Sequence, residues 1–135
     1  MMKFERKTTI EWGDCDDAGI VFYPKFFYWF DCTWQAMLRS HSLSQRKIRS
    51  QYGAVTPLVD VGATFRSPAT YDDIITIQAE ITEWASRRLR IEYVITCEDR
   101  LIATGFEVRA WAMPLPEGGL KGAAIPEDFS ALFQA

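Results

Sequence analysis

The sequence predicts an α+β fold in which one antiparallel sheet is wrapped around a long helix. Residues 24–39 contain no glycine, and Pro24 is their only proline. Apolar side chains occur on nearly every side of this segment, as expected for a helix surrounded by protein. One segment before it and four after it alternate apolar and polar residues with the two-residue period of half-buried strands. One sheet and one very apolar helix are expected to form two layers around a single core.

Composition excludes several classes of protein. At 135 residues the chain is long enough for a core, and we expect residues 1–135 to form one domain. A hydrophobic content of 48% excludes a disordered chain, and a net charge of −3 gives no basic footprint for nucleic acid. The sequence has no apolar run long enough for a membrane span and no signal peptide. The three cysteines follow no paired motif, so we expect reduced thiols in a cytoplasmic protein.

The elements can be placed in order along the chain. A first strand is expected over residues 4–12, with Phe4, Thr8, Ile10 and Trp12 on its buried face. Pro24 suits the first position of the helix, because its missing N–H would have no partner there. Residues 40–52 are polar and basic, and residues 53–57 break regular structure. The later segments are predicted as strands over 59–66, 75–82, 88–97 and 101–113, a Pro/Gly loop over 114–122 and a short helix over 126–133.

The four later strands are spaced as antiparallel meanders. In the last of them, the smoother face is expected to be the one that carries Ile102, Phe106 and Val108. A sheet that covers one helix still has a second face and open edges, so we expect a homodimer. This arrangement resembles the hotdog fold.

Three carboxylates precede the helix, in the segment Gly13–Gly19: Asp14, Asp16 and Asp17. Asp and Gly form turns, and a purely structural turn is one interpretation. A calcium loop of the EF-hand type is disfavoured, because Ala18 and Lys25 stand where oxygen ligands are required. The third interpretation is an acyl-transfer site, since a helix amino end offers unpaired N–H groups to a developing oxyanion.

Other hydrolytic machinery is missing from the sequence. The only histidine, His41, follows the far end of the helix, roughly 25 Å from Pro24 at 1.5 Å per residue. The sequence contains no G-x-S-x-G elbow, no phosphate-binding glycine loop and too few ligands for zinc. If the chain is an enzyme, carboxylates are expected to carry its chemistry, as nucleophile or as general base.

Two further groups of charged residues allow two interpretations each. Asp31 lies on an apolar stripe of the helix, so it is either paired or placed at a ligand site. Arg87, Arg88 and Arg90 form either a solvated strand edge or a site for a phosphorylated ligand, which arginine forks bind well.

The segment GDCDDAGIVFYP, which begins at Gly13, resembles the 4-hydroxybenzoyl-CoA thioesterase family of hotdog-fold enzymes. The resemblance extends through FFYWFD, TPLVDVGATFRSPATYDD and TIQAEITEW, and thus covers nearly the whole chain. It implies a hotdog fold, hydrolysis of an acyl-CoA without a cofactor or metal, and assembly as a homodimer or a homotetramer built as a dimer of dimers.

The resemblance also implies roles for individual residues. The family's catalytic carboxylate falls on Asp16, while Asp14 would be structural and Asp17 stands where relatives often have proline. The backbone N–H that polarises the carbonyl falls on Tyr23, and Pro24 replaces a histidine found in related branches. Basic residues that follow Glu83–Trp84 would contact CoA across the subunit interface. The residues assigned to substrate binding are Gly19, Asp31, Thr56, Arg87 and Arg88.

The sequence therefore predicts an acyl-CoA thioesterase for an aromatic or a short to medium acyl group. A hotdog dehydratase is disfavoured, because it normally requires a histidine near the turn. A non-catalytic hotdog domain that binds acyl-CoA or a protein is the alternative from another class.

Overall fold

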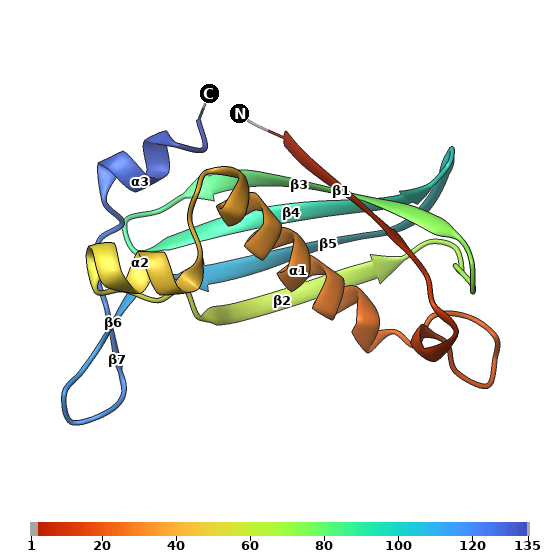
Figure 1. Cartoon of the computed structure of the whole chain (residues 1–135), viewed down its shortest axis with the longest axis horizontal. Coiled ribbons are helices and arrows are strands. Elements are labelled where there is room, and N and C mark those ends of the chain that lie inside the picture. The colour runs from red at the N-terminus through yellow and green to blue at the C-terminus, as the bar shows by residue number, and fades with distance from the viewer. Residues whose placement is uncertain (1–2, 135) are drawn as a thin grey trace.

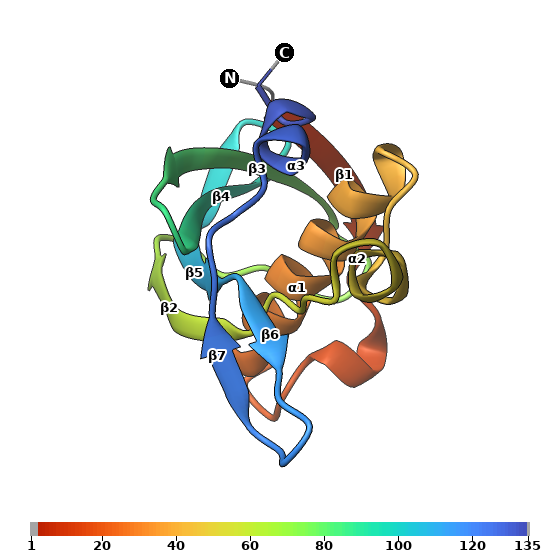
Figure 2. The same ribbon diagram turned by 90° about the vertical axis from the view of Figure 1, so that its left-hand side faces the viewer.

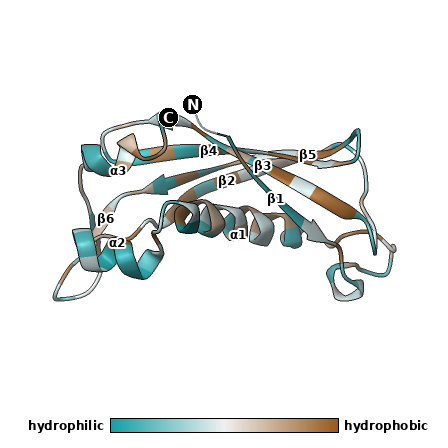
Figure 3. Cartoon of the chain, turned by 45° about the horizontal axis from the view of Figure 1, so that its top comes forward, coloured by the Kyte–Doolittle hydropathy of each residue, from teal (hydrophilic) through white to brown (hydrophobic). Residues whose placement is uncertain are grey.

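The computed structural model describes residues 3–134 and shows a curved antiparallel sheet around helix α1 (Pro24–Ser40). Five strands form the sheet in the order β1-β3-β4-β5-β2: β1 (Lys3–Thr9), β2 (Leu58–Phe65), β3 (Ile74–Trp84), β4 (Arg88–Cys97) and β5 (Arg100–Ala110). Helix α1 lies across the concave side of this sheet (Figures 1 and 3). The predicted α+β hotdog architecture, with five antiparallel strands around a central helix, is confirmed.

Helix α1 begins and ends where its sequence requires. Pro24 occupies the first turn, where no hydrogen bond is lost. At the other end, Ser42 adopts a φ of 59°, and the N–H of Leu43 donates to the Leu38 carbonyl, which closes the helix. The side chains that face the sheet are buried: Phe26, Trp29, Phe30, Thr33, Trp34, Met37 and Leu38.

The sheet differs from a simple meander. Only β3, β4 and β5 pair in sequence order, whereas β1 pairs with β3 and β2 pairs with β5. Strands β1 and β2 are therefore the two edges. Strand β2 ends near the amino end of α1, so the segment that follows β2 lies beside the chain that enters this helix.

Several predicted elements need correction. The first strand ends at Thr9, and Trp12 lies in a short 3₁₀ turn, η1 (Trp12–Asp14), with 76% of its surface exposed. The predicted last strand divides at the buried Trp111 into β5 and β6 (Ala112–Pro114). The predicted loop over 114–122 contains β7 (Leu120–Gly122), which pairs with β6 in a projecting hairpin (Figure 2).

Two more features escaped the sequence. Residues 45–52 form helix α2 (Gln45–Tyr52), which Ser44 caps by accepting from the Lys47 N–H, and which Gly53 ends with a φ of 67°. The smoother face predicted for the last strand does not face α1 at Phe106. Gly105, Glu107 and Arg109 face α1, while Phe106 lies on the outer face under the Arg90 guanidinium. The predicted terminal helix is present as α3 (Glu127–Ala131).

Within residues 3–134, no helix has the length and hydropathy needed to cross a membrane.

The close approach of α1 to the sheet depends on Gly105. A Cβ at this position would lie 2.5 Å from Phe30 Cε2 and 2.8 Å from the Gly62 carbonyl oxygen. The ring of Phe30 stacks on Tyr93 at a centroid distance of 4.4 Å, so it has no room to retreat.

We expect Gly105→Ala to lower the free energy of unfolding by about 1–3 kcal/mol through overpacking, measured by chemical denaturation. Gly13→Ala is the matched control, because nothing lies within 4 Å of the added methyl group. Equal stability of the two variants would contradict a tight contact between α1 and β5.

Candidate active site

The acidic turn is held together by Asp14. One of its carboxylate oxygens accepts from the Glu11 N–H at 2.8 Å, and the other lies 3.3 Å from the Lys25 ammonium. Its backbone carbonyl accepts from the Phe22 N–H at 2.9 Å. Asp14 thus joins the start of the turn to the start of α1.

Asp16 lies at the tip of the same turn and is exposed. Its Oδ1 accepts from the Ala18 N–H at 2.9 Å, and its backbone carbonyl accepts from the Gly19 N–H at 2.9 Å. Gly19 has a φ of 78°, a conformation that favours glycine. The turn therefore fixes one oxygen of Asp16, while Oδ2 accepts no hydrogen bond from the residues described.

Tyr23 supplies an unpaired backbone donor at the amino end of α1. Its φ of −54° and ψ of −32° are helical, and Pro24 follows it. Among residues 3–134, its N–H has no hydrogen-bond partner. This donor belongs to the positive end of the helix dipole, where a developing oxyanion is stabilised.

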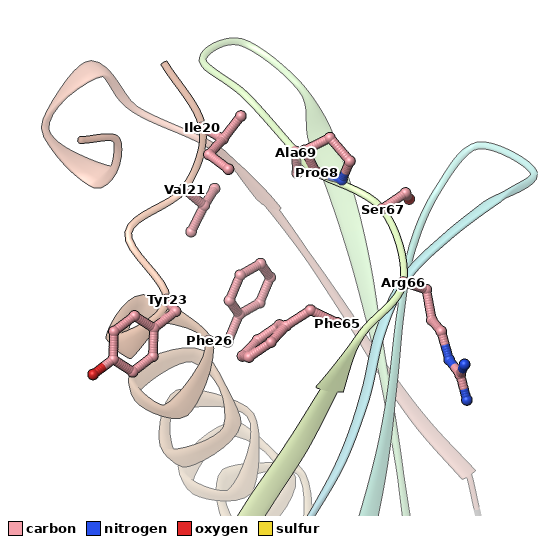
Figure 4. A pocket seen from close by; sticks show the side chains of 9 residues that line it. All are labelled: Ile20, Val21, Tyr23, Phe26, Phe65, Arg66, Ser67, Pro68 and Ala69. Atoms are coloured by element: carbon pink, nitrogen blue, oxygen red, sulfur yellow. The ribbon is translucent and has the colours of Figure 1, made fainter. Parts of the chain in front are cut away.

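A cavity of about 440 Å³ opens beside Tyr23 (Figure 4). It lies between the chain entering α1 and the segment that leaves β2, which a hydrogen bond from the Thr70 hydroxyl to the Gly19 carbonyl joins at 2.6 Å. Arg66 points away from it in Figure 4, so the surface near Tyr23 is mainly apolar. The lining residues are Ile20, Val21, Tyr23, Phe26, Phe65, Arg66, Ser67, Pro68 and Ala69.

Asp31 lies further along α1, Thr56 lies in the segment before β2, and both share a partner, Arg109 of β5. The Arg109 guanidinium donates to Asp31 Oδ1 at 2.8 Å and to the Thr56 carbonyl at 3.0 Å. The Thr56 hydroxyl accepts from Gln45 of α2 at 2.9 Å. The structure thus shows the pairing that the sequence left open for Asp31, and it brings Asp31 and Thr56 into one network.

Glu107 completes this network between the sheet and α1, where its side chain is buried. Its carboxylate accepts twice from Arg109, at 3.0 and 3.1 Å, and once from the Tyr93 hydroxyl at 2.7 Å. Burial, and next the negative charge of Glu107, raise the pKa of Tyr93 well above its ordinary value. Burial lowers the pKa of Arg109, but its hydrogen bond and ion pair with Glu107 outweigh this and raise it. Tyr93, Glu107 and Arg109 therefore form a buried, hydrogen-bonded group in a mainly apolar core, and the half-exposed Asp31 pairs with it from α1.

Arg87 and Arg88 lie at the opposite end of the sheet from Tyr23. Arg88 pairs with Ala110, whereas the cavity end of β5, at Ala103, pairs with Phe65. Seven residues of strand separate these points, about 24 Å at 3.4 Å per residue. A single chain therefore does not bring these arginines to Asp16 and Tyr23, although both are exposed.

Sequence reasoning missed Glu107, Arg109 and Tyr93, which hold the candidate residues Asp31 and Thr56 in one network. Their spacing contained a usable signal, since Glu107 and Arg109 are two apart and so share one face of a strand. Among the residues described, no group of three or more His, Cys, Asp or Glu side chains is arranged to hold a metal ion.

Comparisons with known proteins identify the family of the chain. Residues 10–133 match the thioesterase-like superfamily. The chain is 32% identical to a 4-hydroxybenzoyl-CoA thioesterase of Pseudomonas sp. (strain CBS-3), over 91% of this chain and 92% of that protein. It is 26% identical to a 1,4-dihydroxy-2-naphthoyl-CoA hydrolase of Synechocystis sp., over 92% of this chain and 88% of that protein.

A solved structure is similar over almost the whole chain. It is an aspartate-to-asparagine mutant of 4-hydroxybenzoyl-CoA thioesterase complexed with 4-hydroxybenzoyl-CoA. The TM-score is 0.89 at 30% identity, and the match covers 98% of this chain and 99% of that one.

Fold and comparisons together define a hotdog-fold thioester hydrolase. The chain belongs to the thioesterase-like superfamily, and its resemblance to the 4-hydroxybenzoyl-CoA thioesterases is confirmed.

The raised pKa of Tyr93 predicts how stability depends on pH. The folded protein favours the neutral phenol of Tyr93, whereas the unfolded chain ionises it at the ordinary pKa of 10.0. The contribution of Tyr93 to the free energy of unfolding is therefore complete below about pH 10 and is lost as the pH rises above that value. We expect the free energy of unfolding of the native chain to fall above about pH 10, and Tyr93→Phe to remove most of this fall. Denaturant titrations from pH 8 to about 11 measure it, with Tyr71→Phe as a control for loss of an exposed phenol. A slope that persists unchanged in Tyr93→Phe would contradict the assignment to Tyr93.

Proposed function

We propose that this chain hydrolyses acyl-CoA thioesters to a carboxylic acid and CoA, and that Asp16 is its catalytic carboxylate. The observation that carries the proposal is the unpaired Tyr23 N–H beside an apolar cavity, with the Asp16 turn closing the same helix end. The carbonyl oxygen of the thioester accepts from this N–H, which stabilises the negative charge that develops on the oxygen.

Asp16 can complete the reaction in either of two ways. As a nucleophile, its carboxylate forms a C–O bond to the carbonyl carbon, the C–S bond breaks, CoA leaves as the thiolate, and water then hydrolyses the anhydride. As a general base, it removes a proton from water, whose oxygen attacks the carbonyl, and the proton passes to the departing thiolate. In both routes the Ala18 N–H holds Oδ1 and leaves the second oxygen of the carboxylate available.

An aromatic acyl group, or a short to medium one, fits the site. The ring centroids of Phe26 and Phe65 lie 5.3 Å apart, and both rings line the cavity beside Tyr23. They offer apolar surface to the carbons next to the thioester. The relatives from Pseudomonas and Synechocystis act on aryl thioesters of CoA by their names, which supports the aromatic class. Gly19, with its positive φ, allows the turn to place the next residue, Ile20, in the cavity wall. Asp31 and Thr56 are assigned to the far end of the acyl group.

The arginines Arg87 and Arg88 are proposed to bind CoA phosphates in the site of a partner subunit. Their distance from the Tyr23 of the same chain means that they can reach only the site of a partner subunit. Strand β2 is an edge strand and exposes Leu58, Val59 and Phe65 by 45–48%, which favours a homodimer through this side of the molecule. Two such dimers would form the proposed homotetramer.

Replacing Asp16 with Asn is expected to lower kcat by about 10²–10⁴ while leaving the fold intact, because the side chain is exposed and keeps its size. The assay is release of CoA from a panel of aromatic and aliphatic acyl-CoA thioesters. Asp17→Asn, in the same turn, is the matched control and should keep kcat within a few-fold. Near-normal turnover by Asp16→Asn would overturn the catalytic assignment. Binding of thioesters by the native chain without hydrolysis of any would favour the alternative, a non-catalytic binding domain.

The double variant Arg87→Ala/Arg88→Ala is expected to raise KM about tenfold or more with little change in kcat, because each lost contact is a charge-assisted hydrogen bond to phosphate. A mixture with the Asp16→Asn chain tests whether the contact crosses the interface. Mixed dimers would then contain one site with both defects and one with neither, so low-KM turnover should reappear on mixing. If the KM stays high in the mixture, the arginines do not act in the partner's site.

A further inference from the structure

The loop of residues 66–73, which follows β2, is attached directly to the acidic turn. Figure 4 shows this loop opposite the chain that leads from the turn into α1. Two hydrogen bonds cross between the two segments. The Val21 N–H donates to the Ala69 carbonyl at 2.9 Å, and the Thr70 hydroxyl donates to the Gly19 carbonyl at 2.6 Å. The turn is thus held from outside by one backbone contact and one side-chain contact of this loop.

Gly19 belongs to the same set of hydrogen bonds as Asp16. The Gly19 N–H donates to the Asp16 carbonyl, and the Ala18 N–H donates to Asp16 Oδ1, both at 2.9 Å. Residues 16–20 are exposed, and a Cβ on Gly19 would meet nothing within 4 Å, so packing does not hold this part of the turn. Among residues 3–134, Thr70 is the one residue whose side chain donates to residues 16–20 from outside the turn. The direction of the Asp16 carboxylate therefore depends on hydrogen bonds rather than on burial.

Thr70 is itself held in place by Asp73 and Arg100. The Thr70 N–H donates to Asp73 Oδ2 at 3.0 Å, and the Asp73 N–H donates back to the Thr70 carbonyl at 3.1 Å. The same Asp73 oxygen lies 3.6 Å from the guanidinium of Arg100, the first residue of β5. Arg100 also donates to the Pro68 carbonyl and, at 3.3 Å, to the Ser67 hydroxyl. The backbone of Thr70 is thus fixed, and its hydroxyl reaches the turn from a set direction.

The loop has an anchor in the core, which the turn lacks. Ile10 is fully buried and exchanges two backbone hydrogen bonds with the end of the loop, at 2.8 and 2.9 Å. The reaction proposed above needs the Asp16 carboxylate at a fixed distance from the thioester carbon that the Tyr23 N–H orients. A misplacement of about 1 Å in a reacting group can lower the rate about a hundredfold. An exposed turn that carries such a group therefore needs a contact to a rigid neighbour.

We propose that Thr70 is a positioning residue for Asp16: its hydroxyl, by donating to the Gly19 carbonyl, holds the exposed turn where the Asp16 carboxylate can react. The inference rests on the proposed thioesterase function and adds to it a residue outside the cavity lining. Thr70 does not touch the substrate. Asp73 and Arg100 act through Thr70, since they fix its backbone.

The test compares Thr70→Val with Thr70→Ser in the release of CoA from an acyl-CoA that the native chain hydrolyses. Valine keeps the shape of threonine and removes the donor, so kcat should fall about tenfold or more. KM should change little, because the residues that line the cavity are the same. Thr70→Ser keeps the hydroxyl and should restore most of kcat. Arg100→Met should lower kcat less than Thr70→Val, since the contact between Thr70 and Gly19 remains.

Two controls separate positioning from a general effect on the fold. The exposed hydroxyl of Ser50 in α2 also donates to a backbone carbonyl, that of Lys47 at 3.1 Å, so Ser50→Ala removes the same kind of contact elsewhere and should leave kcat and KM unchanged. The double variant Asp16→Asn/Thr70→Val is measured in single turnover with the protein in excess, where slow rates can be read. It should be no slower than Asp16→Asn alone, because Thr70 acts through the Asp16 carboxylate.

Three results would overturn the inference. One is a kcat of Thr70→Val close to that of the native chain, or a Thr70→Ser that is as slow as Thr70→Val. The second is a raised KM at unchanged kcat, which indicates that the loop only shapes the cavity. The third is a double variant slower than Asp16→Asn by the full factor of Thr70→Val, since Thr70 would then act independently of Asp16. Failure of the native chain to hydrolyse any thioester, or near-normal turnover by Asp16→Asn, is a different result, because it removes the proposed function itself.

Discussion

The pairing of the buried Arg109 guanidinium is the interaction on which the arrangement of α1, α2 and the sheet depends. A lone buried charge costs several kcal/mol, so the residues around Arg109 must supply acceptors. They come from three places far apart in the sequence: Glu107 on the same strand, Asp31 on α1, and the Thr56 carbonyl before β2. The guanidinium can be satisfied in only one relative placement of these elements. These hydrogen bonds add direction to the close packing of Phe30 on Gly105, and together they favour one register of α1 on the sheet.

That fixed register has a consequence at the other end of the helix. Because α1 is clamped at Asp31 and closely packed at Gly105, its amino end cannot shift relative to the segment that leaves β2. Hydrogen bonds from Val21 to the Ala69 carbonyl and from Thr70 to the Gly19 carbonyl then join the turn to that segment. The position of the Tyr23 N–H and of the cavity beside it thus depends on the contacts of Asp31, about two helical turns further along α1. Oxyanion stabilisation requires such rigidity, since a donor that reorients during the reaction loses most of its effect.

The sequence predicted the parts of this structure that depend on local pattern. Strand alternation and the apolar run after Pro24 identified the sheet and α1, because their periods come from backbone geometry alone. Helix α2 was missed because it is short and its residues are almost all polar: Ile48 and the partly buried Tyr52 mark its apolar face, which is too brief a pattern to stand out in the sequence. The inner face of β5 was missed for the opposite reason. Its buried side chains include Glu107 and Arg109, which are expected in solvent when only apolar residues are placed inside, although their two-residue spacing allows them to pair on one face.

The same limit applies to the candidate site. Asp16 and Tyr23 were named from the resemblance of one short motif to a known family, because a turn and the helix start that follows it lie together in the sequence. Asp31 could not be resolved, since pairing and ligand binding both explain a carboxylate on an apolar stripe. Its geometry shows the pairing directly: Arg109 and Gln35 donate to Oδ1, while no residue among 3–134 donates to Oδ2. Both features depend on how β5 packs against α1, so the pattern along α1 alone could not predict them.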